Sequence, residues 1–216
     1  MLGTKTDKKN IELIKLVAQL RDHIDIHRII GLNVASLRNS DISNAFIGYL
    51  QKAAQESLAI YFCKIFESST RHELNSISGI IDSLPSSVFS VDQRSEFFTF
   101  GKKYGNDAKP TEAKPHLKQT FGLFCGIHSG ALDRLKEFRD KIGAHSDSKA
   151  AIDSLPSHAE FETLYSFAAD FYGLVSRFVI NSGPAMVPRQ AGKGLVKLME
   201  SMGVNAPKFD FGADDE

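Results

Sequence analysis

The sequence has little of what membrane-bound and secreted proteins carry. Its 216 residues include no apolar run that approaches the length of a membrane span. The chain starts Met-Leu-Gly-Thr-Lys-Thr-Asp-Lys-Lys, without the apolar core of a signal peptide. Both absences predict a cytoplasmic protein without a membrane anchor.

A basic excess is also missing. Lysine plus arginine and aspartate plus glutamate each number 26, so the formal net charge is zero. Proteins that bind nucleic acids strongly and without sequence preference usually carry a surplus of basic residues. Any contact with a nucleic acid must therefore be local, or must be built by pairing two chains.

Cysteine is scarce, and two common sequence motifs are absent. Cys63 and Cys125 both stand in apolar helical stretches, where they are expected to be buried small hydrophobes in a reducing compartment and not a disulfide or metal site. No Gly-x-Ser-x-Gly elbow is present. The segment 192–194 resembles a phosphate loop, but Val187 stands where that motif needs its first glycine.

Apolar residues recur at helical spacing through most of the chain, and no stretch of any length alternates as a strand does. Predicted long helices span 11–37, about 42–68, 115–143 and 158–180, with shorter helices after two capping boxes, at Thr70 and Ser90, and a loop at 104–110. With 42% hydrophobic residues, this pattern predicts an all-α antiparallel bundle in one domain, residues 1–182. A third capping box at Ser157 opens the last long helix.

The remaining residues, 183–216, have a different character. They read as a loop, a short helix at 195–202 and an acidic C-terminal end. We expect this tail to be mobile or to pack on a partner.

Three glycines recur every four residues in the predicted helix 115–143: Gly122, Gly126 and Gly130. Each costs a helix interior about 1 kcal/mol relative to alanine. Close approach of another helix, within the bundle or across a dimer, is the favoured compensation, and a kink is the alternative. The apolar residues that flank the glycines are expected in the core and not in a base-stacking platform: Phe121, Phe124 and Ile127.

Two pairs of residues have a spacing that zinc ligands use. His23 and His27 stand one helical turn apart, as do His158 and Glu162. An isolated pair supplies only two ligands, and such pairs are common on solvated helix faces. The sequence therefore predicts no metal and no cofactor.

The residues that carry chemistry gather in segment 138–147, Phe-Arg-Asp-Lys-Ile-Gly-Ala-His-Ser-Asp. Arg139 supplies a permanent cation whose shape suits phosphate, and His145 can transfer protons near neutral pH. Together they indicate metal-independent chemistry on a phosphodiester. The alternative is that Arg139 and Asp140 are surface charges and that His145 is a partly buried histidine at a helix end.

The helical phase of this segment bears on both interpretations. Leu135, Phe138, Ile142 and His145 follow at steps of three and four, so His145 continues the apolar stripe of the helix. Gly143 is a place where the helix can loosen. If it loosens there, His145 is free to turn toward the arginine.

Segment 139–147, Arg-Asp-Lys-Ile-Gly-Ala-His-Ser-Asp, resembles the signature of HEPN domains, an arginine and a histidine separated by four to six residues. More narrowly, it resembles the abortive-infection U branch of that family. The residues Glu56-Ser57-Leu58 and the stretch Cys63-Lys64-Ile65-Phe66-Glu67 that follows them also resemble this branch. The resemblance covers about residues 8–180. Some relatives carry a tyrosine two residues after the histidine, and Asp147 stands there, so regulation by tyrosine modification is not supported.

The resemblance implies an endoribonuclease that acts as a toxin or as an abortive-infection effector in phage defence. Its site would consist of Arg139, His145 and Asp140, shared across the two-fold axis of a homodimer, with RNA as substrate. An antitoxin or another regulatory protein would be a partner. Two other functions stay open: a non-catalytic HEPN module that binds RNA, a nucleotide or a partner protein, and an antitoxin-like or scaffold role.

Overall fold

The computed structural model describes most of the chain as helix. The described residues are 4–40, 42–68, 75–84, 91–144, 155–181, 183, 190–204 and 207–211. They contain nine α-helices, one π-helical turn and no strand. The predicted all-α fold class is therefore confirmed.

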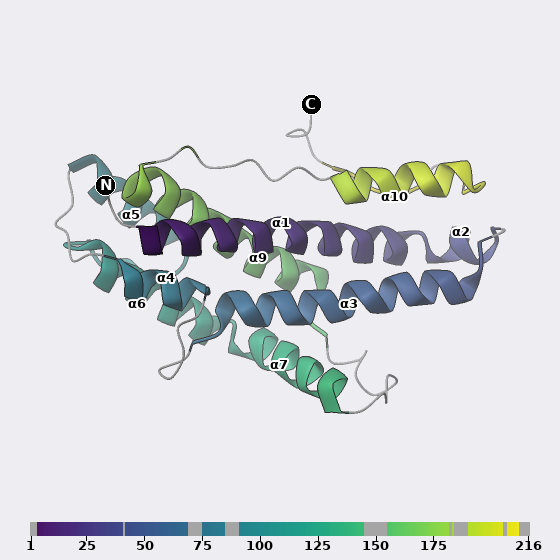
Figure 1. Ribbon diagram of the computed structural model, residues 1–216, viewed down its shortest axis with the longest axis horizontal. Coiled ribbons are helices and arrows are strands. Elements are labelled where there is room, and N and C mark those ends of the chain that lie inside the picture. Colours follow the sequence, from purple (N-terminus) through teal and green to yellow (C-terminus); the bar gives the residue numbers. More distant parts are fainter. Residues whose placement is uncertain are drawn as a thin grey trace.

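The described elements are helices throughout. In chain order they are α1 (Thr4–Leu32), α2 (Val34–Arg38), α3 (Asn44–Phe66), α4 (Ile77–Ser83), α5 (Val91–Lys103), α6 (Ala113–Ile127), α7 (Ser129–Ala144), α9 (His158–Val175), the π-helical turn η1 (Ser176–Ile180) and α10 (Gln190–Ser201). The two longest helices, α1 and α3, lie side by side and run in opposite directions, with α9 packed across α1 (Figure 1).

Local sequence signals account for several helix ends. The predicted capping box at Ser157 is confirmed: its side chain accepts a hydrogen bond from the backbone N–H of Glu160, whose carboxylate accepts one from Ser157. The capping boxes predicted at Thr70 and Ser90 fall on residues outside the described part of the chain. Within it, the Ser76 side chain caps α4 by accepting from the N–H of Gly79 at 3.2 Å.

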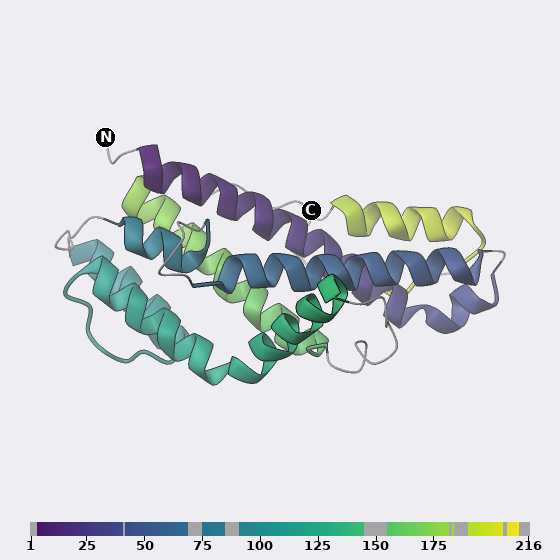
Figure 2. The same cartoon turned by 60° about the horizontal axis from the view of Figure 1, so that its bottom comes forward.

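The helix predicted over residues 115–143 is instead two helices. α6 ends at Ile127, His128 interrupts the helix, and α7 starts at Ser129. Figure 2 shows α6 and α7 as the two arms of a V. The bend turns α7 back onto α3, so the kink that the sequence analysis considered as an alternative is present.

The glycines next to this bend do not bring another helix of the same chain close. A Cβ atom built on Gly122 or Gly126 meets nothing within 4 Å, and both residues are exposed. Close packing within the bundle is therefore wrong for these two positions. Of the flanking apolar residues, Phe124 is in the core as expected and Phe121 is partly buried against it, whereas Ile127 is 65% exposed and does not belong to it.

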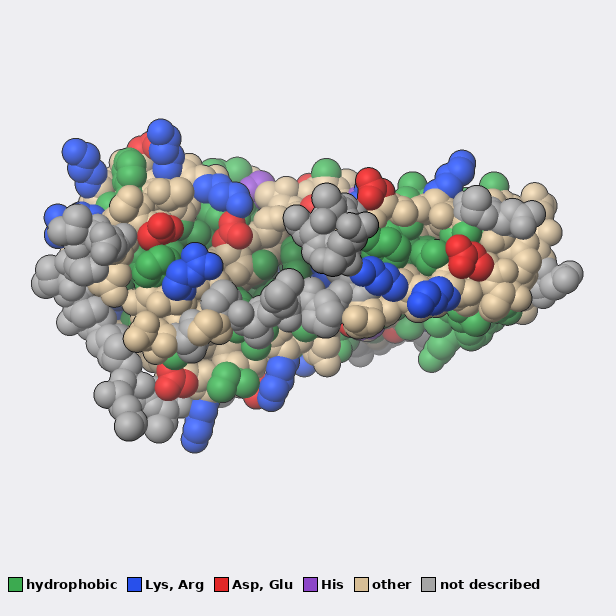
Figure 3. Space-filling view, turned by 90° about the horizontal axis from the view of Figure 1, so that it is seen from above, with side chains coloured by type: hydrophobic (Ala, Val, Ile, Leu, Met, Phe, Trp, Pro, Cys, Tyr) green, Lys and Arg blue, Asp and Glu red, His purple; other side chains and the backbone are tan. Residues whose placement is uncertain are grey.

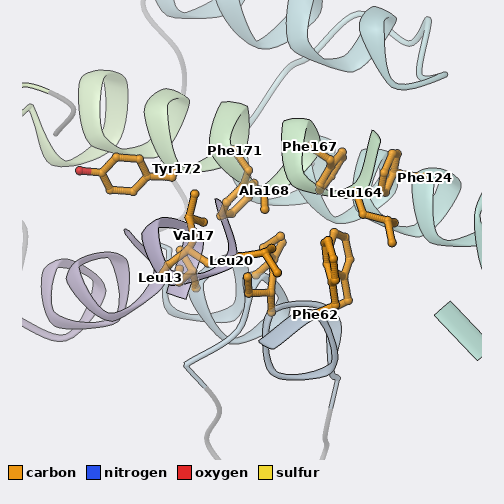
Figure 4. Close-up of a cluster of buried hydrophobic side chains, with 14 of the residues drawn as sticks. Leu13, Val17, Leu20, Phe62, Phe124, Leu164, Phe167, Ala168, Phe171 and Tyr172 are labelled. Atoms are coloured by element: carbon orange, nitrogen blue, oxygen red, sulfur yellow. The ribbon is translucent and has the colours of Figure 1, made fainter. Parts of the chain in front are cut away.

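Aromatic side chains fill the centre of the bundle. Phe124 of α6 stacks on Phe167 of α9, with ring centroids 4.0 Å apart, and Phe62 of α3 stacks on Phe161 of α9 at 5.5 Å. Figure 4 shows Phe62, Phe124 and Phe167 in one cluster with aliphatic side chains of α1. Four helices far apart in sequence thus share one core, which fixes α6 and α9 against α1 and α3.

A second, smaller core holds the end of the chain. Met199 of α10 and Val204 are almost fully buried against apolar residues of α1, α2 and α3. Asn33 accepts a hydrogen bond from the backbone N–H of Lys208 at 2.7 Å and donates one to its carbonyl oxygen at 3.0 Å. Helix α10 therefore packs on its own chain (Figure 1), contrary to the expectation of a mobile tail or one that needs a partner.

Candidate functional site

Arg139 lies near the end of α7, beside the apolar face with which this helix packs on α3. Leu135 and Phe138 are almost fully buried, and they hold that face against α3. Arg139 follows Phe138 directly, so its side chain starts at the edge of the contact and is 36% exposed. The third predicted site residue, His145, lies outside the described residues.

Arg139 and Asp140 contact one another directly. The Nε of Arg139 donates to Oδ1 of Asp140 at 3.0 Å, and Nη2 lies 3.0 Å from the same oxygen. Partial burial lowers the pKa of Arg139, but the hydrogen bond to Asp140 and nearby negative charges raise it by more, so the group stays cationic. Because both side chains are well exposed, the pair adds little stability. The contact with Asp140 instead fixes the orientation of the Arg139 guanidinium.

Arg139 lines an open cleft of about 600 Å³ between α3, α6 and α7, the motif cleft. Two lysines line it as well, Lys118 from α6 and Lys136 from α7, together with the carboxylates of Glu67 and Asp133. Lys136 donates to Oδ1 of Asp133 at 3.3 Å. The motif cleft is thus lined by three cations and two anions, and Asp140 pairs with one of the cations, so the charges balance while Lys118, Lys136 and Arg139 still offer contacts to an anionic ligand.

Each wall of the motif cleft is one face of a helix. On α6 the lining residues Lys118, Phe121, Gly122 and Cys125 recur at steps of three, one and three, which places them on the same side of the helix. Lys136 lies one turn before Arg139 on α7. The two lysines were not predicted as site residues. Their helical phase relative to the glycines and to Arg139 is the signal in the sequence that points to them.

Both cysteines line the motif cleft, one fully buried and one partly. Burial raises the pKa of the Cys63 thiol, and the nearby Arg139 lowers it by less. Burial also raises the pKa of Cys125, to about 11. Both thiols are free and protonated near neutral pH, so the interpretation as small hydrophobes holds for Cys63, while Cys125 is partly open to the cleft.

A second polar group of residues lies where α1, α3 and α9 meet: the histidine cluster, composed of His23, His27 and His158. The rings of His27 and His158 are 4.8 Å apart between centroids, although the two residues are distant in sequence. The Nδ1 atoms of all three are buried and find no hydrogen-bond partner among the described residues. All three side chains are partly buried, unlike the pairs of this spacing that are common on solvated helix faces.

The histidine cluster does not supply a metal site. Among the described residues, no group of three or more His, Cys, Asp or Glu side chains could hold a metal ion. Glu162, one turn after His158, accepts two hydrogen bonds from Arg21 at 2.7 and 2.8 Å. Arg21 also contacts the buried Asp25 at 2.8 Å, so these charges join α1 to α9.

Burial lowers the pKa of each histidine in the cluster. For His27 it reaches about 4, with the neighbouring His158 as the second cause. Burial and the nearby Arg28 lower the pKa of His158, and burial lowers that of His23. The lowered pKa values favour the neutral form of all three histidines at physiological pH.

Acid is expected to destabilise the fold through His27. Its pKa of about 4 in the folded chain lies below its ordinary value of 6.5, so the unfolded chain binds the proton first. The stability that neutral His27 contributes is fully present above about pH 6.5, and up to about 3 kcal/mol of it is lost as the pH falls from 6.5 to about 4. Urea unfolding at several pH values between these limits measures the loss.

The variant His27→Gln, which cannot titrate, should lose less stability over the same pH range. His128→Gln is the matched control, since His128 lies outside the cluster, and it should behave like the unsubstituted chain. An identical pH dependence in His27→Gln and the unsubstituted chain would contradict the prediction.

Figure 3 shows the face of the molecule that carries α1 and α10. There, acidic and basic side chains are interspersed over α1 and α10, as expected for a chain with equal numbers of both. Within the described part of the chain, no helix is long and apolar enough to cross a membrane.

Comparison with known proteins agrees with the resemblance in the motif. The family model HEPN_AbiU2, described as AbiU2, matches residues 10–188 and so includes all three predicted site positions. No curated protein and no solved structure matches the chain. The match spans well over half of the sequence, from α1 to beyond η1, and the chain therefore belongs to the AbiU2 family of HEPN domains, a module related to abortive infection.

Proposed function

We propose that this protein is an endoribonuclease that cleaves RNA without a metal ion, as an abortive-infection effector or toxin in the cytoplasm. The observation that carries the proposal is the position of Arg139, oriented by Asp140 on the wall of an open cleft with two lysines. A guanidinium presents donors in the geometry that a phosphate needs. The family match, which spans the whole motif, adds support.

The reaction would be attack of an RNA 2′-oxygen on the adjacent phosphorus. The bond from phosphorus to the 5′-oxygen breaks, which leaves a 2′,3′-cyclic phosphate and a 5′-hydroxyl. One proton leaves the 2′-hydroxyl and another reaches the 5′-oxygen, and His145 would serve in these transfers as base or acid. Arg139 would stabilise the extra negative charge of the phosphorane, while Asp140 holds the guanidinium in place.

A homodimer completes the proposal. One chain supplies one motif histidine, whereas the reaction transfers two protons, so two motifs that face each other across a two-fold axis would provide one histidine for each. Pairing two chains would also bring together two copies of Arg139, Lys118 and Lys136. A regulatory partner such as an antitoxin would then act by covering the cleft or separating the chains.

Cleavage of a labelled RNA is expected to continue in excess chelator and to yield 2′,3′-cyclic phosphate and 5′-hydroxyl ends. The reason is that Arg139 and His145 supply both the charge and the proton transfers. Gel analysis with end-specific enzymes identifies the products, and an oligomer without 2′-hydroxyls serves as the uncleavable control. Loss of activity in chelator, or equal cleavage of DNA, would contradict this mechanism.

The alternative is a HEPN module that binds RNA, a nucleotide or a partner protein without cleaving it. The zero net charge favours it, because a nuclease that acts on many RNAs gains from a basic surface. Expression of the protein in a bacterial host separates the two functions. A nuclease slows growth and Arg139→Ala relieves the effect, whereas a binding module has no such dependence on Arg139.

A further inference from the structure

The motif cleft contains an aromatic ring in addition to its cations. Phe121 of α6 is half-buried and lines the cleft. It stacks on Phe66 with ring centroids 6.1 Å apart and planes inclined by 16°, and it contacts Phe167 at 6.0 Å. These contacts fix the ring while part of it stays open to the cleft. Its accessible part is therefore a rigid apolar surface next to charged groups.

There is room beside this ring. Gly122, the next residue of α6, also lines the cleft, and a Cβ atom built on it meets nothing within 4 Å. A side chain at this position would occupy the open space of the cleft. The glycine, which costs the helix stability, thus leaves the wall next to Phe121 clear for a planar group.

Cations flank the ring on two helices. Lys118 is exposed, one turn before Phe121 on α6, and Lys136 is 58% exposed on α7, one turn before Arg139. The hydrogen bond from Lys136 to Asp133 is 3.3 Å long and solvent-exposed, so it exchanges at little cost when an anion binds. Lys136 and Arg139 share a helix face, which allows them to contact neighbouring phosphates of one strand.

We infer that the motif cleft binds a single-stranded segment of RNA, with a base stacked on Phe121 and the phosphates beside the scissile one held by Lys118 and Lys136. This inference rests on the proposed function, which supplies RNA as the ligand. The carboxylates of Glu67, Asp133 and Asp140 balance the three cations, so phosphate contacts alone provide limited affinity. Stacking of an unpaired base supplies the rest, and a duplex cannot provide it because its bases are stacked on each other.

The test is the affinity of an uncleavable single-stranded 2′-O-methyl RNA octamer, measured by fluorescence anisotropy at several salt concentrations. The variant Phe121→Leu is expected to weaken binding about 5- to 100-fold with an unchanged salt slope, since it removes the aromatic face and no charge. Lys118→Gln and Lys136→Gln should each reduce the slope of log affinity against log salt by about 0.7. Lys102→Gln, on α5 and outside the cleft, is the matched control.

A second variant distinguishes a loss of binding from a loss of the fold. Gly122→Leu fills the cleft but meets open space in the protein, so it should keep the fold and lose binding. A hairpin of the same length is expected to bind more weakly than the single strand. Equal affinity for hairpin and single strand, or octamer binding that neither Phe121→Leu nor Gly122→Leu affects, would overturn the inference.

Failure of the inference and failure of the proposed function give different results. If the expected binding pattern is found but RNA with intact 2′-hydroxyls is not cleaved, the cleft binds RNA and the nuclease mechanism is wrong. If RNA is cleaved but the Phe121 and lysine variants bind as the unsubstituted chain does, the nuclease stands and this placement of the strand is wrong.

Discussion

Alanine at Arg139 or at His145 is expected to lower the rate of RNA cleavage by about 10²–10⁴-fold, the usual effect of removing a group that transfers protons or stabilises developing charge. The fold should persist, because Arg139 is 36% exposed and makes its one described ion pair with its sequence neighbour Asp140. Single-turnover cleavage, measured on protein whose helicity and oligomeric state are unchanged, gives the result. Asp140→Ala should cost less, because the role proposed for Asp140 is to orient Arg139.

The matched control is His158→Ala. His158 belongs to the histidine cluster, in ring contact with His27 on α1, and it is absent from the lining of the motif cleft. Folded His158→Ala protein should therefore cleave RNA at the normal rate. Full activity in His145→Ala together with lost activity in folded His158→Ala would refute the assignment of the motif and leave the binding function for segment 139–147.

The sequence predicts helices well here because their apolar spacing is local information. The bend between α6 and α7 is different. Apolar residues keep helical spacing on both sides of His128, so the pattern reads as one continuous helix. Tertiary packing explains the bend. α7 gains more stability by packing Leu135 and Phe138 on α3 than by continuing along α6. The glycine-rich sequence on both sides marks the place, but it does not say which helix the second arm packs on.

The candidate site, too, can be predicted from the sequence only in part. Arg139, Asp140 and His145 stand within seven residues, so a single sequence shows them together, and the family match includes them. The motif cleft is different, because α3, α6 and α7 each contribute one face to it. Lys118 can be recognised as a neighbour of Arg139 only once the bend at His128 is known. Likewise, nothing in the sequence indicates that His27 and His158 are in ring contact.

The composition of residues 183–216 does not predict that α10 packs on the bundle. The acidic end and loop-like beginning of this tail suggested a mobile segment, yet Met199 is 1% exposed. The reason is complementarity: the end of α1, with α2 and the start of α3, leaves apolar surface that one amphipathic helix can cover. Such a match between distant segments is not visible from either segment alone.

Alanine at Phe167 is expected to reduce the free energy of unfolding by about 3–5 kcal/mol, the usual range for truncation of a buried phenylalanine. Phe167 is fully buried and lies at the centre of the aromatic cluster, 4.0 Å from the ring of Phe124 and 4.7 Å from that of Tyr104 between centroids. Its loss leaves a cavity between α5, α6 and α9 that rigid neighbouring rings cannot fill. Urea unfolding followed by circular dichroism measures the change.

The surface provides the control for this prediction. Tyr49 is an aromatic residue of α3 that is 68% exposed, so Tyr49→Ala should change stability by no more than about 0.5 kcal/mol. Because Phe167 also contacts Phe121, its loss should loosen the wall of the motif cleft. We therefore expect folded Phe167→Ala protein to bind single-stranded RNA more weakly, whereas Tyr49→Ala should not. Equal stability of the two variants would show that this cluster is not the core that holds α6 in place.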